Sequence, residues 1–115
     1  MKIAQIQMHV SGDKTADLRH AAELIRGAGE IDLAVLPEMF CCPYDNSCFH
    51  RYGEEAGGEA QQALSALARE RGIWLIGGPI PELEGGNVYN TSFVHAPYGS
   101  CAARHRKTHL FDIDV

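Results

Sequence analysis

The stretch Ile31-Asp32-Leu33-Ala34-Val35-Leu36-Pro37-Glu38 is a short apolar run that ends at a proline. Such a run is typical of a buried strand. Proline has no backbone N–H to donate to a neighbouring strand, so we expect the strand to end at Pro37. Glu38 would then stand at the carboxyl end of a strand, where ligand sites collect in layered α/β sheets.

Amphipathic helices are predicted on both sides of this strand. Upstream, the carboxylate of Asp13 is placed to cap a helix that ends near residues 27–29. The apolar face of that helix is formed by Leu18, Ala21, Ala22, Ile25 and Ala28. Downstream, residues 59–71 carry a second apolar face, and Gly72 stands where a left-handed C-terminal cap is expected.

Strands are predicted for most of the remaining chain. The expected strands cover residues 2–10, 73–76, 88–96 and 101–107, with turns at 77–79, 84–87 and 97–100. Residues 39–58 are rich in turn-forming residues and are expected to be irregular. The order β-α-β-α-β-β-β predicts an α/β or α+β fold with a layered sheet and helices outside.

The length and charge of the chain argue against several classes of protein. The 115 residues suit one small domain. Fifteen acidic residues outnumber ten basic ones, and the basic run Arg104-His105-Arg106-Lys107 is short, so we expect no nucleic-acid partner. No apolar run approaches the roughly 18–20 residues of a membrane helix. The N-terminus does not read as a signal peptide, so a cytoplasmic protein is predicted.

The cysteines and histidines give little support for a disulfide or a metal site. The four cysteines are Cys41, Cys42, Cys48 and Cys101. They show no Cys-x-x-Cys spacing, and without an export signal they are expected to be reduced, buried or half-buried thiols. His105 and His109 would lie about 13 Å apart on a strand, too far for one ion. No metal is expected. A protein that binds metal or reacts through its thiols is a weaker alternative interpretation of the Cys and His residues.

Glu38 and Lys107 are the candidate catalytic residues. Glu38 has apolar neighbours in the sequence, and a carboxylate that loses solvation suits a general base. An ammonium such as that of Lys107 can stabilise a developing oxyanion. Each residue also has a simpler interpretation, because Glu38 could be a loop acid paired with an arginine and Lys107 part of a solvated edge strand.

Taken together, these segments resemble the nitrilase, or carbon–nitrogen hydrolase, superfamily. The stretch Leu36-Pro37-Glu38-Met39-Phe40 resembles the general-base motif of that family, and residues 105–112 resemble its catalytic-lysine motif. Residues 4–7, 76–82 and 89–91 resemble its other strands, in the same order. The run at 110–114 looks most like the omega-amidase-like branch. The resemblance implies the N-terminal portion of an α-β-β-α sandwich.

The resemblance also implies a mechanism. Glu38 would be the base that takes a proton from a cysteine thiol, and Lys107 would stabilise the oxyanion formed when the thiolate attacks an amide or nitrile carbon. The implied substrate is a small-molecule amide, and the omega-amidase-like resemblance points to the ω-amides of dicarboxylic acids. No metal or organic cofactor is implied, and the intact enzyme is expected to form a homo-oligomer.

Phe40 and Tyr44 are candidate substrate-binding residues. They follow Glu38 in the segment predicted to be irregular, and they resemble residues that line the mouth of the substrate pocket in this family. Aromatic side chains at these places would serve equally well to pack the loop onto the sheet, and the sequence leaves both interpretations open.

The nucleophilic cysteine of the family is not matched in this sequence. Cys41 and Cys42 stand too close to Glu38 along the chain for the separate positioning that a triad requires, and Cys101 lies in the strand before Lys107. We therefore expect residues 1–115 to be a partial carbon–nitrogen hydrolase domain that lacks the C-terminal part with the nucleophile and is inactive alone. The alternative is a non-catalytic remnant or interaction module that retains the start of the fold.

Overall fold

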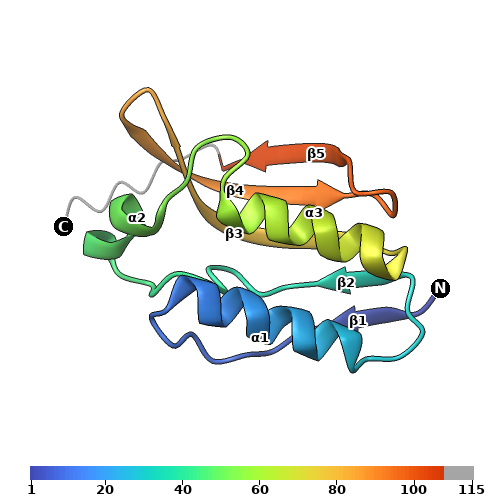
Figure 1. Cartoon of the computed structure of the whole chain (residues 1–115). Helices are drawn as coiled ribbons and strands as arrows, with labels where there is room; N and C mark the ends of the chain where they lie inside the picture. The colour runs from blue at the N-terminus through green and yellow to red at the C-terminus, as the bar shows by residue number, and fades with distance from the viewer. Residues whose placement is uncertain (108–115) are drawn as a thin grey trace.

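The computed structural model describes residues 1–107, apart from the side chain of Asn46. Its elements are β1 (Ile3–Gln5), α1 (Lys14–Arg26), β2 (Leu33–Val35), α2 (Asn46–Tyr52), α3 (Glu59–Arg71), β3 (Trp74–Glu84), β4 (Asn87–His95) and β5 (Cys101–Arg106). Figure 1 shows α1 and α3 side by side on one face of a single sheet. No helix in this described part is long and apolar enough to cross a membrane.

The sheet has five strands in the order β1-β2-β3-β4-β5. β1, β2 and β3 are parallel, whereas β4 pairs antiparallel with both β3 and β5. The main core lies between the sheet and the two long helices and includes Ile25, Leu64, Leu75 and Phe93, all at most 2% exposed. This arrangement confirms the predicted α/β class with a layered sheet.

The two long helices begin and end where the sequence predicts. The Asp13 carboxylate accepts a hydrogen bond from the Ala16 N–H at 3.1 Å, and Gly72 adopts the left-handed conformation (φ 64°, ψ 40°) after α3. The prediction was wrong for Ala28, which follows the end of α1 and is exposed. The helix stops at Arg26, so its apolar stripe cannot extend that far.

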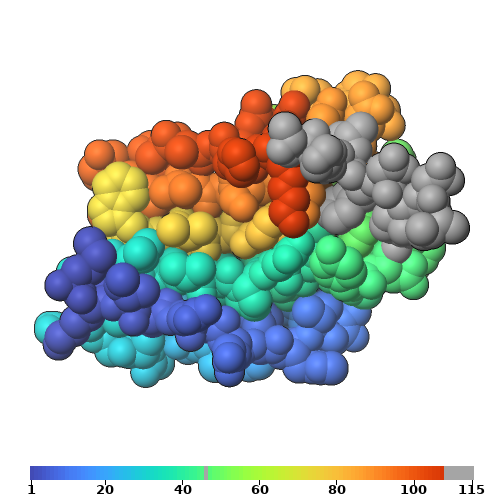
Figure 2. Space-filling model, turned by 180° about the vertical axis from the view of Figure 1, so that it is seen from behind, coloured from blue at the N-terminus to red at the C-terminus, as the bar shows by residue number. Residues whose placement is uncertain are grey.

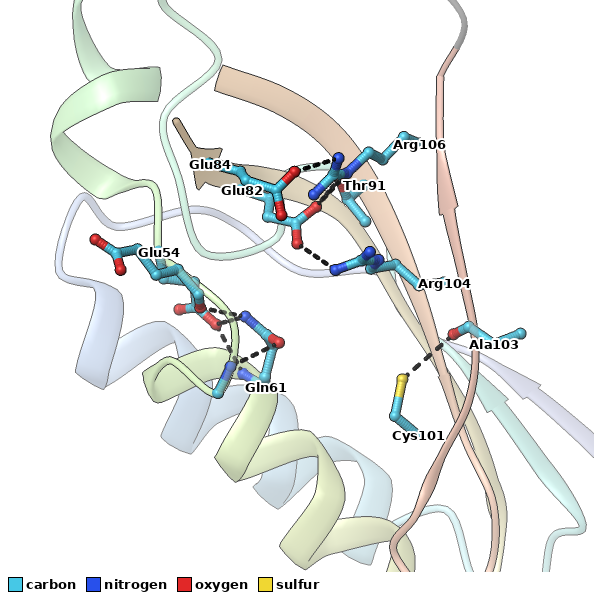
Figure 3. Close-up of polar contacts among 11 residues, drawn as sticks. Glu54, Gln61, Glu82, Glu84, Thr91, Cys101, Ala103, Arg104 and Arg106 are labelled. Carbon is cyan, nitrogen blue, oxygen red and sulfur yellow. Dashed lines mark hydrogen bonds and ion pairs between the residues drawn. The ribbon is translucent and has the colours of Figure 1, made fainter. Parts of the chain in front are cut away.

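Buried Glu54 caps the start of α3 from outside the helix. Its carboxylate accepts hydrogen bonds from the backbone N–H groups of Ala60 and Gln61, both at 2.9 Å, and from the Gln61 side chain (Figure 3). Lys14 of α1 pairs with the same carboxylate at 2.6 Å. A negative charge at a helix N-terminus is stabilising, so this contact fixes α3 relative to α1.

β3 is longer than predicted. It continues through Gly77-Gly78-Pro79 to Glu84, because a register shift between Gly77 and Ile80 accommodates the proline within the ladder. Gly77 packs against Leu64 of α3 so closely that a Cβ atom would overlap that side chain. The glycines therefore let the strand pass beneath the helix and do not end it.

The segment predicted to be irregular contains the short helix α2. Asp45 caps it by accepting a hydrogen bond from the Ser47 N–H at 3.0 Å, and Phe49 is buried. Seven residues are too few for an apolar repeat to stand out from the surrounding turn formers. β1 and β2 are shorter than predicted, although the backbone bond from Leu36 N–H to the Ile76 carbonyl, 2.9 Å, extends the pairing past β2.

Both long helices lie on one face of the sheet (Figure 1), and Figure 2 shows the molecule from behind. A shallow apolar hollow of about 260 Å³ lies on the face of the sheet away from α1 and α3, and it is lined by Met1, Leu33, Trp74, Ile76 and Val94. Trp74 is 40% exposed, because its side chain lies on this face of β3.

Candidate active site

Glu38 and Lys107 meet, although 69 positions separate them in the sequence. The Lys107 Nζ atom lies 3.2 Å from the Glu38 Oε1 atom. β5 runs in the same direction as β2, because two antiparallel pairings separate β5 from β3. The residues that follow β2 and β5 therefore reach the same edge of the sheet.

The backbone around Glu38 is held on both sides. The Leu36 N–H donates to the Ile76 carbonyl at 2.9 Å, and the Met39 N–H donates to the Pro79 carbonyl at 2.7 Å. Met39 has a positive φ of 53°, which costs a residue with a Cβ atom about 1 kcal/mol or more. This buried turn directs the chain over β3 and presents Glu38 at a defined place.

Asn90 is a third polar residue of this site, and no role was predicted for it beyond its place in the motif at 89–91. Its Nδ2 atom lies 3.4 Å from the Glu38 Oε1 atom, and its carbonyl accepts the Lys107 N–H at 3.0 Å. Thr91 pairs with Arg106 in the register of β4 and β5, which places Asn90 directly opposite Lys107. Asn90 is 3% exposed.

The pair formed by Glu38 and Lys107 is open to solvent. The side chains are 41% and 48% exposed, respectively. The predicted apolar surroundings of the Glu38 carboxylate are wrong: Leu36, Met39 and Phe40 turn into the protein, whereas Glu38 faces a lysine. An ion pair this exposed contributes only about 0–1 kcal/mol to stability. A role in binding a ligand therefore explains this pair better than a role in stabilising the fold.

Phe40 and Tyr44 lie in different environments. Phe40 is fully buried in the main core, where it packs the loop onto the sheet. Tyr44 is 68% exposed, and its ring meets Phe49 edge-on at 5.5 Å between centroids. Only Tyr44 therefore presents a surface that a small molecule can contact, and the substrate-binding role of both residues stays a prediction.

None of the cysteines forms a hydrogen bond with Glu38 or Lys107 within residues 1–107. Burial raises the pKa of Cys41 and of Cys42 to about 12, so both are neutral thiols at neutral pH and poor nucleophiles. Cys101 is exposed, which makes the prediction of a half-buried thiol wrong at that position. Its side chain lies on β5 and approaches the Ala103 carbonyl (Figure 3).

The basic run before Lys107 is divided between the two faces of the sheet. Arg104 and Arg106 both bind the carboxylate of Glu82, at 3.0 and 2.9 Å, and Thr91 donates to it at 2.7 Å (Figure 3). Burial alone would raise the pKa of Glu82, but these donors outweigh burial and lower it. Alternate residues of a strand face opposite sides of the sheet. Lys107 therefore lies on the face opposite to Arg104 and Arg106, where it contacts Glu38.

No group of three His, Cys, Asp or Glu side chains among residues 1–107 is arranged to hold a metal ion. His109, the second histidine considered above as a ligand, lies outside the described residues.

The chain belongs to the carbon–nitrogen hydrolase family, whose sequence model matches residues 2–115. It is 46% identical over 116 residues to the omega-amidase NIT2 of Mus musculus and equally to that of Danio rerio. Each match covers 99% of this chain and 42% of the relative. The crystal structure of Saccharomyces cerevisiae Nit3, a member of branch 10 of the nitrilase superfamily, superimposes with a TM-score of 0.87 at 37% identity, covering 96% of this chain and 45% of Nit3.

These comparisons confirm the resemblance to the nitrilase superfamily and its omega-amidase-like branch, and they confirm the fold class. The chain spans less than half the length of the relatives named above. The rest of each relative has no counterpart in residues 1–115, and the site formed by Glu38, Asn90 and Lys107 lies within the matched part.

Proposed function

We propose that this chain supplies the general base and the oxyanion-stabilising lysine of an amide hydrolase. The observation that carries the proposal is the 3.2 Å contact between the Lys107 Nζ and Glu38 Oε1 atoms, which joins the ends of two separate segments. A carboxylate and an ammonium in contact, both open to solvent, can share the proton transfers and the negative charge of acyl transfer.

In this proposal the nucleophile is a cysteine thiol. Glu38 takes the thiol proton, and the thiolate sulfur attacks the amide carbon while Lys107 stabilises the resulting oxyanion. Glu38 then returns the proton to the nitrogen as the carbon–nitrogen bond breaks and ammonia leaves. Water, deprotonated by Glu38, cleaves the thioester and releases the carboxylic acid. The cycle needs no oxidant and no cofactor.

The thiol itself is assigned to a part of the hydrolase domain outside residues 1–115. Cys41 and Cys42 are buried neutral thiols, and Cys101 lies on β5 with its sulfur near the Ala103 carbonyl. Residues 1–115 are accordingly a partial domain that is inactive by itself. The free cysteines fit a reducing, cytoplasmic location, and a homo-oligomer is proposed for the whole protein.

The proposed substrates are monoamides of short dicarboxylic acids. The support is the similarity to proteins named omega-amidases, at 46% identity. Tyr44, exposed on the loop after Glu38, is the proposed contact at the mouth of the pocket, with Phe40 supporting the loop from the core.

Ammonia release tests this function. The whole protein is expected to release ammonia from succinamate or glutaramate faster than from acetamide, whereas residues 1–115 alone release none. Absence of turnover with every amide and nitrile tested would contradict hydrolysis. Turnover by residues 1–115 that disappears in Glu38→Gln would show that the nucleophile lies within this chain.

A further inference from the structure

We propose that Asn90 is a positioning residue that holds the Glu38 carboxylate against Lys107. The inference rests on the proposed function, since it gives Asn90 a part in the same site. Asn90 touches both candidate residues: its side-chain amide faces the Glu38 Oε1 atom at 3.4 Å, and its carbonyl accepts the backbone N–H of Lys107 at 3.0 Å.

The strand pairing makes Asn90 a fixed point between the two residues. Asn90 belongs to β4, which pairs with β3 through Pro81 on one side and faces Lys107 on the other. At 3% exposure its side chain is held by its surroundings. Glu38 and Lys107 are each about half open to solvent and have many rotamers, so a rigid donor at Oε1 reduces the freedom of the carboxylate.

The unpaired oxygen of Asn90 argues against a purely structural role. The Oδ1 atom is buried and has no hydrogen-bond partner among the described residues. A buried acceptor without a donor destabilises the folded state. Turning the amide over would place Oδ1 against a carboxylate oxygen, which is worse. The side chain is therefore oriented to donate to Glu38, at a cost in stability.

The division of the effect between kcat and KM separates positioning from support of the fold. A residue that orients the base acts on the reaction step and leaves ground-state binding of the substrate unchanged. Asn90→Ala in the whole protein is expected to lower kcat about tenfold or more with little change in KM. Asn90→Asp, nearly the same size, should lower kcat at least as far, because a second carboxylate in place of the amide donor repels Glu38.

Other charged groups near Asn90 are unchanged in these variants. Lys107 and His105 lie on the β5 side of Asn90. Pro81, Val88 and Ser92, which neighbour Asn90 on β3 and β4, carry no charge. Ser92→Ala is the matched control, because Ser92 is on the same face of β4 two residues from Asn90 and forms no side-chain hydrogen bond within residues 1–107. It should leave kcat and KM at their wild-type values.

The results distinguish this inference from the proposed function. Rates for the folded enzyme are normalised by active-site titration, and unfolding temperatures identify a variant that fails to fold. If Glu38→Gln is inactive while Asn90→Ala and Asn90→Asp keep the wild-type kcat, the positioning role is wrong and the function stands. If Glu38→Gln keeps wild-type activity, the proposed function itself is wrong.

Discussion

Replacing Glu38 with glutamine in the whole protein is expected to lower kcat for amide hydrolysis on the order of 10³-fold, the typical effect of losing a general base. The amide of glutamine cannot take the thiol proton, and it cannot deprotonate water for the second step. The measurement is the steady-state rate of ammonia release from a dicarboxylic monoamide.

The loss of activity should come without a loss of stability. The ion pair between Glu38 and Lys107 is about half exposed, so solvent screening limits its contribution, and the unfolding free energy of Glu38→Gln should change by less than about 1 kcal/mol. Glu30→Gln makes the same chemical change at an exposed glutamate on another part of the surface and should be neutral. Wild-type turnover by Glu38→Gln would exclude Glu38 as the base.

Replacing Lys107 with methionine is expected to lower kcat by about 10²- to 10³-fold while KM changes little. Methionine keeps most of the length of the side chain but removes the ammonium that is proposed to stabilise the oxyanion. An interaction formed only in the transition state affects kcat and not ground-state binding. Stopped assays across a range of substrate concentrations give both constants.

Lys2→Met is the matched control for Lys107→Met, because Lys2 is exposed near the N-terminus and its side chain forms no hydrogen bond or ion pair in the described part of the chain. It should retain wild-type kcat. If Lys107→Met raises KM and leaves kcat unchanged, Lys107 binds the substrate and does not stabilise the oxyanion.

Local patterns in the sequence placed Glu38 at the end of a strand and bounded the two long helices, whereas the assignment of Lys107 rested on the family resemblance. The apolar run before Pro37 located the end of β2 and therefore Glu38, and the caps at Asp13 and Gly72 bounded the two long helices. These features depend on neighbours within a few residues. Turn chemistry and helix periodicity therefore predict them without knowledge of the rest of the fold.

Strand register could not be predicted in the same way. A shift between Gly77 and Ile80 offsets β3 against β4, and another between Val94 and His95 offsets β4 against β5. A slip of one residue moves every side chain to the opposite face. The contact of Asn90 with Lys107 depends on the second shift, so no pattern within either strand alone predicts it.

Packing between elements accounts for the other differences. The Gly77-Gly78 pair looked like the end of a strand, but Gly77 is small because Leu64 of α3 lies against it. The acidic residue Glu82 gave no signal of its role, since its three donors come from other strands. Such contacts join residues far apart in the sequence and appear only when the chain is folded.

Mapping the acyl-enzyme tests the central claim most directly. The whole protein is quenched in acid during turnover of a dicarboxylic monoamide and analysed by intact and peptide mass spectrometry. We predict a thioester adduct on a cysteine outside residues 1–115 in the wild-type protein and no adduct in Glu38→Gln. An adduct on Cys41, Cys42, Cys48 or Cys101, or one that forms at the wild-type rate in Glu38→Gln, would contradict the assignment of Glu38 as the base for a nucleophile supplied from elsewhere in the domain.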